Sequence, residues 1–325
     1  MRESSGRCPV CGSVVDEEDL FCANCGTESP RHAQEPSQAD SSRLTKNNFV
    51  CSGCGASMSY DAGAEALRCP FCGSADMVSK PDAQRLAPKR IVPFRWTREQ
   101  AEQRMRKWLG RGFWRPKGLS ESARVAKMTA VYVPYWVFEA KTHTYWTADT
   151  DQTPPGAEAA WYPLAGEHEG SYGGLLIGAS GAIATRETAA ICPFDLADAV
   201  APEKIDLENV IFEQFSMPRK YARPLARQGL EAAETEACAA CVPGRSRNVH
   251  VNVLVSEMSS EPVLLPVWIM AYTFRDKLYR FLVNGQTGRA TGEAPISLAK
   301  LAGAVLAAVA VVAAIILLLG VLGGR

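Results

Sequence analysis

The sequence lacks the short motifs that mark most nucleotide-using and hydrolytic enzymes. No G-x-x-x-x-G-K run followed by Ser or Thr occurs, which argues against a P-loop ATPase or helicase. The serine-hydrolase pattern G-x-S-x-G, the zinc-protease pattern H-E-x-x-H and a dinucleotide-binding fingerprint are also missing. We therefore expect that this protein is not an enzyme.

Histidine is scarce, with four residues in a chain of 325. None of them has the spacing of a metal-ligand or triad motif. His32 lies in a polar stretch and His168 stands alone, while His143 and His250 are expected on strand surfaces. The histidines therefore predict no catalytic site.

Three cysteines lie in the central part of the sequence. Cys192, in the run ICPFDL, is expected to be a buried apolar thiol. Cys238 and Cys241 form a C-x-x-C pair, but they fall in a predicted helix and lack a following glycine turn. A redox pair is usually found where a helix begins, whereas this pair is placed where one ends. We favour helix packing over a redox or metal role.

The chain lacks a net charge, but its charges are unevenly distributed. Segment 89–127 has twelve Lys or Arg residues and three acidic ones, and segment 149–213 has twelve acidic residues and two basic ones. We favour an arrangement in which the two segments pack together and neutralise each other. The alternative is that the basic segment binds anionic lipid or nucleic acid.

No apolar run is present near the N-terminus, so no signal peptide is expected. Residues 301–324, in contrast, form an uncharged apolar run of 24 residues. As a helix this run is about 36 Å long, enough to cross a hydrocarbon core of roughly 30 Å. We expect one transmembrane helix over 299–324. Arg289 and Lys300 lie before the apolar run 301–324, which favours a cytoplasmic body.

Cysteine pairs are the most specific feature that is present. The first 72 residues contain four C-x-x-C pairs, each followed by glycine, with the cysteines Cys8, Cys11, Cys22, Cys25, Cys51, Cys54, Cys69 and Cys72. Two successive pairs supply the four thiolates of one structural Zn²⁺, so we predict two zinc ribbons and two ions. Disulfides or an iron site are the alternatives, and the regular spacing without secretion features favours zinc. Reduced cysteines also agree with a cytoplasmic body.

The composition divides the chain into six segments. Residues 1–26 form ribbon 1 and 49–77 form ribbon 2, and both are followed by polar linkers, 27–48 and 78–90. An α+β body is expected over 91–295, ahead of the membrane helix at 299–324.

Local patterns predict the main elements of the body. Thr97 to Gln100 form a capping box that begins a helix, and Gly110 ends it. Aromatic, β-branched or alternating runs predict strands at 131–146 and 249–255, a hairpin of 263–274 with 277–283, and a turn at 284–285. A second helix is predicted over 224–241.

A short internal echo suggests that the body is duplicated. Residues 133–138 (VPYWVF) match 265–270 (LPVWIM) in having an apolar residue, Pro, any residue, Trp and two apolar residues. Each copy follows a predicted helix, as expected for two copies of one α+β unit. A proline within each predicted strand indicates an edge or a bulge.

These features together resemble a known family. The N-terminal C-P-x-C-G ribbon, then YVPYW, ICPFDL and VNGQTG (283–288), resemble bacterial membrane proteins labelled TFIIB-type zinc-ribbon proteins, some of which are mislabelled as primosomal helicases. The resemblance covers the second ribbon and most of the body, and ribbon 1 is additional. It implies no established enzymatic activity, and for some relatives it implies anchoring of phage-shock-type or flotillin-like (SPFH) proteins.

We therefore expect a tail-anchored scaffold or adaptor that binds proteins at the cytoplasmic face of a membrane, in envelope stress. The alternative is a membrane-tethered regulator that binds nucleic acid through the basic segment 89–127. Ribbon 1 carries the acidic run Asp16–Asp19, which argues against DNA contact there.

Overall fold

The computed structural model describes residues 6–8, 10, 12, 14–15, 47–60, 68–79, 86–156, 159–205, 211–275 and 277–323. The helices are α1 (Arg98–Leu109), α2 (Leu119–Ser122), α3 (Thr185–Ala190), α4 (Arg219–Cys241) and α5 (Leu298–Gly323), with short 3₁₀ turns η1 (Leu196–Asp198) and η2 (Pro202–Lys204). The strands are β1 (Gly6–Arg7), β2 (Val14–Val15), β3 (Asn47–Cys51), β4 (Ser57–Tyr60), β5 (Met77–Ser79), β6 (Arg90–Ile91), β7 (Arg124–Thr150), β8 (Tyr162–Gly178), β9 (Ile211–Glu213), β10 (Ser246–Phe274), β11 (Lys277–Asn284) and β12 (Ala290–Gly292). The predicted α+β class is confirmed.

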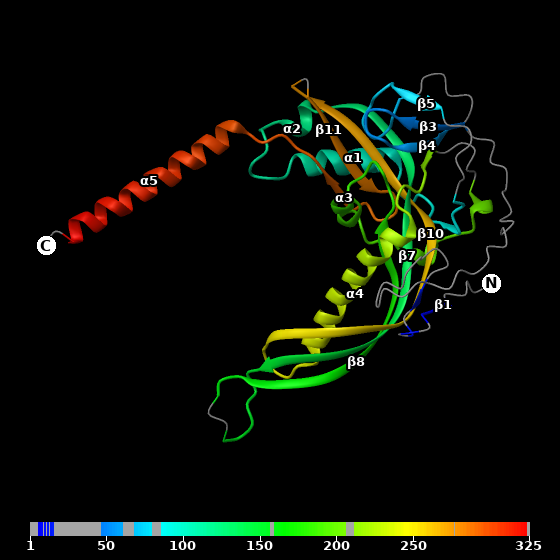
Figure 1. The fold of residues 1–325 in the computed structure, drawn as a ribbon. Helices are drawn as coiled ribbons and strands as arrows, with labels where there is room; N and C mark the ends of the chain where they lie inside the picture. The colour runs from blue at the N-terminus through cyan, green and yellow to red at the C-terminus, as the bar shows by residue number, and fades with distance from the viewer. Residues whose placement is uncertain are drawn as a thin grey trace.

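Two long antiparallel strands, β7 and β10, form the spine of the molecule (Figure 1). At one end β11 pairs with β10 and α1 packs nearby; we call this end the upper arm. At the other end β8 pairs with β7 and α4 packs against the strands; we call this end the lower arm. Both arms therefore contain the paired long strands, a return strand and a long helix.

The register of the spine matches the internal echo. Val133 lies opposite Leu265, and these two residues are equivalent in the echo. Since the strands are antiparallel, a rotation of about 180° about an axis between these two residues places 133–138 on 265–270. The arrangement of the two arms thus agrees with the predicted repeat.

Each proline of the echo lies at the point where its long strand stops pairing with one neighbouring strand and begins to pair with another. On β7, Pro134 lies between the residues that pair with β9 and those that pair with β8, and its carbonyl accepts from the Ala179 N–H at 2.9 Å. On β10, Pro266 lies between the partners of β6 and β11, and its carbonyl accepts from the Gly285 N–H at 2.8 Å. The absence of an N–H group on each proline therefore removes no hydrogen bond between strands.

Local sequence patterns predicted both long helices of the body. Thr97 caps α1 with the expected capping box, and Gly110 is its C-cap. The apolar side of α1 packs on the upper arm, with Met105 and Leu109 buried. Helix α4 begins at Arg219, before the predicted start at residue 224, so that Pro224 lies in its second turn and interrupts the helix only near its beginning.

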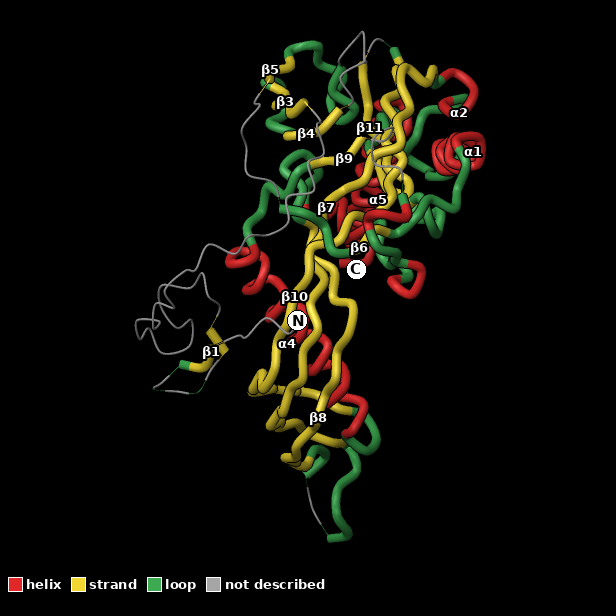
Figure 2. Tube along the Cα trace, turned by 90° about the vertical axis from the view of Figure 1, so that its right-hand side faces the viewer, coloured by secondary structure: helices red, strands yellow, loops and turns green. Residues whose placement is uncertain are grey.

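Ribbon 2 is continuous with the sheet of the body. Strand β9 pairs in parallel with β7 and antiparallel with β4, so that the order β12-β11-β10-β7-β9-β4-β3-β5 includes the ribbon (Figure 2). The Gln214 amide donates to Ser59 Oγ at 2.7 Å, and Ser59 donates to buried Asn48 at 2.9 Å. The segments predicted as ribbon 2 and body thus share one sheet.

Among the described residues, an ion pair connects the two charged segments. Arg95, in the basic segment, pairs with Asp198, in the acidic one. Another basic residue, Arg106, instead pairs with Glu102 within its own helix. The basic segment is thus neutralised partly by the acidic segment and partly by itself.

Helix α5 extends away from the body in Figure 1. In the described parts of the chain, no helix combines the length and the apolar character needed to cross a membrane. The transmembrane helix expected over 299–324 is therefore not found there.

Candidate metal centre

The two cysteine knuckles of ribbon 2 have the same backbone turn. The Gly55 N–H donates to the Cys51 carbonyl at 2.8 Å, and the Gly73 N–H donates to the Cys69 carbonyl at 2.9 Å. Gly55 and Gly73 have φ of 75° and 77°, a conformation that glycine adopts without a Cβ clash. The glycine after the second cysteine of each pair thus lets the backbone turn at both knuckles of this ribbon.

These turns bring four sulfur atoms together. The Sγ atoms of Cys51, Cys54, Cys69 and Cys72 all lie within 4.8 Å of one another. The Cys51–Cys72 and Cys54–Cys69 sulfur pairs are each 3.5 Å apart. Four thiolates at about 2.3 Å from a tetrahedral Zn²⁺ would be roughly 3.8 Å apart, so a small expansion accommodates the ion. The cluster could hold a metal ion such as zinc.

Backbone N–H groups point at the sulfurs and favour their ionised form. Burial alone would raise the pKa of Cys51, but N–H groups of Cys54 and Gly53 donate to its sulfur and the net pKa is lowered. At Cys69 burial is the larger effect and raises the pKa to about 11, against donation from the Cys72 and Phe71 N–H groups. A metal ion must therefore displace a proton from Cys69.

The centre lies against the body. Cys51, Cys69 and Phe71 are buried in the same apolar cluster as Val131 and Leu282 of the spine and β11. The Lys127 ammonium donates to the Arg68 carbonyl at 2.9 Å, beside the second knuckle. The four-cysteine cluster therefore shares its buried packing with the spine and with β11 of the upper arm.

Ribbon 1 is described only in part. The Gly12 N–H donates to the Cys8 carbonyl at 2.9 Å, and Gly12 has φ of 70°, as in both knuckles of ribbon 2. The other three predicted ligands, Cys11, Cys22 and Cys25, lie outside the described residues. The structure therefore shows one of the two predicted four-cysteine clusters.

Sequence reasoning missed a second group of potential ligands. His168 was taken as isolated and Cys238 as a packing residue, but the structure places both beside the buried Glu234. The spacing of Glu234 and Cys238, four residues apart on one helical face, was the available signal. No local pattern could have connected them to His168. Cys192, in contrast, is half-buried against the core, close to its predicted environment.

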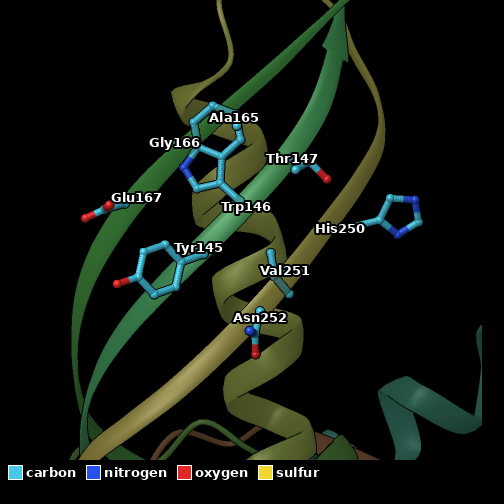
Figure 3. Close-up of a pocket in the computed structure, with 9 residues that line it drawn as sticks. All are labelled: Tyr145, Trp146, Thr147, Ala165, Gly166, Glu167, His250, Val251 and Asn252. Carbon is cyan, nitrogen blue, oxygen red and sulfur yellow. The ribbon is translucent and has the colours of Figure 1, made fainter.

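A hollow of about 530 Å³ lies on the three strands of the lower arm. It is lined by Tyr145, Trp146, Thr147, Ala165, Gly166, Glu167, His250, Val251 and Asn252. Figure 3 shows Glu167 on β8 and His250 on β10 pointing away from each other, at the two outer edges of these strands. The hollow therefore does not bring these two groups together for acid–base chemistry.

Comparison with known proteins gives a full-length relative. "Uncharacterized protein YdjG" of Bacillus subtilis (strain 168) is 26% identical to this chain over 319 residues, which cover 92% of each protein. No family model matches the chain, and no solved structure matches it. The similarity thus extends over most of both chains.

Proposed function

We propose that this protein is a zinc-ribbon scaffold or adaptor that binds other proteins at the cytoplasmic face of a membrane. The main supporting observation is the cluster of Cys51, Cys54, Cys69 and Cys72 built into the sheet of the body. Four thiolates complete the tetrahedral shell of Zn²⁺ and leave no position for a substrate. Such a centre stabilises a surface and supplies no chemistry, which agrees with a protein that is not an enzyme. Ribbon 1 would hold the second Zn²⁺.

Strand β5 forms one edge of the sheet among the described residues, and this edge offers a surface for a protein partner. Strand β5 ends the strand order and pairs on one side with β3. Val78 on this strand is 53% exposed. An extended peptide can add to such an edge through main-chain hydrogen bonds. We propose that membrane or peripheral proteins, of the phage-shock or SPFH type, dock at this edge.

Membrane attachment is part of the proposal and rests on the sequence. The uncharged run 301–324 is long enough to cross a lipid bilayer as one helix. Arg289 and Lys300 before it favour a cytoplasmic body.

Nucleic acid is the less favoured partner. Several cations of the basic segment are engaged within the protein: Arg90 pairs with Glu261, Arg95 with Asp198 and Arg106 with Glu102. Phosphate binding would require such side chains to give up their partners. A salt-dependent mobility shift of the full chain with duplex DNA or RNA would support this alternative.

The proposal is tested by cross-linking in native membranes. A photoreactive residue is placed at Val78, and the matched control carries it at Tyr221, which is 61% exposed on α4. We expect a discrete adduct with a membrane or peripheral protein from position 78 alone, lost when Cys69→Ser removes a ligand. Equal adducts from both positions, or an adduct that survives Cys69→Ser, would contradict docking at a zinc-dependent edge.

A further inference from the structure

Metal-ligating side chains also converge in the lower arm, apart from the ribbon. His168 on β8 and Glu234 and Cys238 on α4 place their donor atoms within 4.8 Å of one another. Glu234 and Cys238 are fully buried, whereas the His168 side chain is 25% exposed. Two of the three side chains are therefore buried inside the protein, and the third, His168, is partly open to solvent.

The packing of α4 on the sheet creates this group. Glu234 and Cys238 lie one helical turn apart on the buried face of α4. That face meets β7, where the Thr142 hydroxyl donates to Glu234, and the neighbouring Thr144 is opposite His168 in the β7–β8 register. A Cβ at Gly170 would overlap Glu234 and Thr142, so glycine is needed there for the approach.

Glu234 is a buried carboxylate without a strong cationic partner. Burial would raise its pKa, but hydrogen bonds from Thr142, Tyr172 and His168 outweigh burial and lower the pKa. Within the described chain no Lys or Arg forms an ion pair with it, and its basic partner is His168, whose Nδ1 lies 2.8 Å from Oε2. A buried carboxylate of this kind needs a compensating positive charge.

We propose that His168, Glu234 and Cys238 bind a divalent metal ion of the zinc class. Imidazole nitrogen, carboxylate oxygen and thiolate sulfur are the three ligand types that Zn²⁺ takes in proteins. When the ion binds, the Cys238 thiol loses its proton to solvent, and the proton on His168 Nδ1 leaves that nitrogen so that a neutral imidazole is the ligand. The thiolate and the carboxylate then neutralise the two positive charges of the ion. Three protein ligands leave the fourth tetrahedral position to a water molecule, unlike the closed four-sulfur centre.

The site requires a small adjustment to accept the ion. Ligand N and O atoms at about 2.0–2.1 Å from a tetrahedral metal are roughly 3.3 Å apart, so the His168–Glu234 contact of 2.8 Å must lengthen by about half an ångström. The exposed edge of His168 permits this movement and gives the ion a path from solvent.

Metal content of the full chain tests the site. We expect Cys238→Ser to lose about one Zn²⁺ per chain relative to the wild type, with the ribbon zinc retained. The matched control is Cys241→Ser, since Cys241 is exposed and belongs to the same C-x-x-C pair. Wild-type metal content in a folded Cys238→Ser protein would overturn the proposal.

A second variant covers the case in which Cys238→Ser fails to fold. His168→Ala removes a partly exposed ligand, and His143→Ala is its control because His143 contacts Glu167 and Glu169 instead. Titration with Co²⁺ should show affinity at this site lowered at least about tenfold in His168→Ala and unchanged in His143→Ala. Equal Co²⁺ binding by both variants would mean that His168 and Glu234 form an ion pair only.

Discussion

The carboxyl group of Glu213 lies buried where ribbon 2 meets the body. Glu213 is opposite Met58 in the β4–β9 pair, and its Oε1 accepts from the Gly181 and Ala182 N–H groups at 2.9 and 3.2 Å. Its Oε2 has no hydrogen-bond partner among the described atoms. Burial raises its pKa to about 7. Below about pH 7 the neutral form is thus favoured in the folded state.

This pKa predicts a pH-dependent stability. Between about pH 4.5 and 7 the unfolded state has lost the Glu213 proton and the folded state retains it, so stability falls as pH rises. The loss amounts to about 3 kcal/mol at pH 8, given about 1.4 kcal/mol per pKa unit. Glu213→Gln should flatten the dependence. Thermal melts at pH 5.5 and 8 measure the change of stability with pH. An equal change in the wild type and in Glu213→Gln would contradict its assignment to Glu213.

The metal ligands show how far single residues could be predicted. The C-x-x-C spacing identified Cys51, Cys54, Cys69 and Cys72, because each knuckle is a local turn that fixes two sulfurs. His168 and Glu234 were beyond such reasoning, since they are 66 residues apart and meet only through packing of α4 on β8.

At the scale of elements, the VNGQTG run (283–288) is a structural turn. The Asn284 amide donates to the carbonyls of Ile191 and Pro193 at 2.9 and 3.0 Å. The side-chain oxygen of Gln286 accepts from the Asp195 N–H at 2.8 Å. The turn therefore joins β11 to the ICPFDL segment and needs no ligand-binding role.

Gly288 ends this turn in a position that excludes a side chain. It has φ of 71°, and a Cβ there would overlap the Trp96 ring. We expect Gly288→Ala to lower the free energy of unfolding by more than about 1–2 kcal/mol, the cost of the left-handed backbone alone. Gly173→Ala is the control, because no atom lies within 4 Å of its added Cβ. Chemical denaturation compares them, and equal midpoints would refute the packing argument.

Elements with local signals were predicted well. The capping box at Thr97 and the hairpin whose strands end and begin at Phe274 and Lys277 are confirmed. The sequence did not reveal that β7 extends from Arg124 to Thr150, or that β9 joins ribbon 2 to the spine. Both features depend on pairing between distant segments, and a local pattern contains no information on the partner strand.

At the scale of the whole molecule, the packing of ribbon 2 against the body predicts that the two unfold as one cooperative unit. Cys51 and Cys69 share a buried cluster with Val131 and Val267 of the spine. Removing zinc with a chelator should therefore destabilise the upper arm as well as the ribbon. Hydrogen exchange on β10 and β11 measures this, and unchanged protection there would show that the ribbon is an independent unit.

Membrane attachment is also tested on the whole molecule. Deleting residues 297–325 should move the protein from the membrane pellet to the soluble fraction, since this removes the apolar run 301–324. The full chain, treated in the same way, is the control. Persistence of the truncated protein in the pellet would contradict anchoring by this segment.

The central claim is that the four-cysteine centre is a closed zinc site that supports a binding surface. X-ray absorption at the zinc edge of the Cys238→Ser chain tests it most directly, because this variant lacks the mixed-ligand site. We predict a first shell of four sulfurs at about 2.3 Å. A nitrogen or oxygen ligand in that shell, or the absence of bound zinc, would contradict the account.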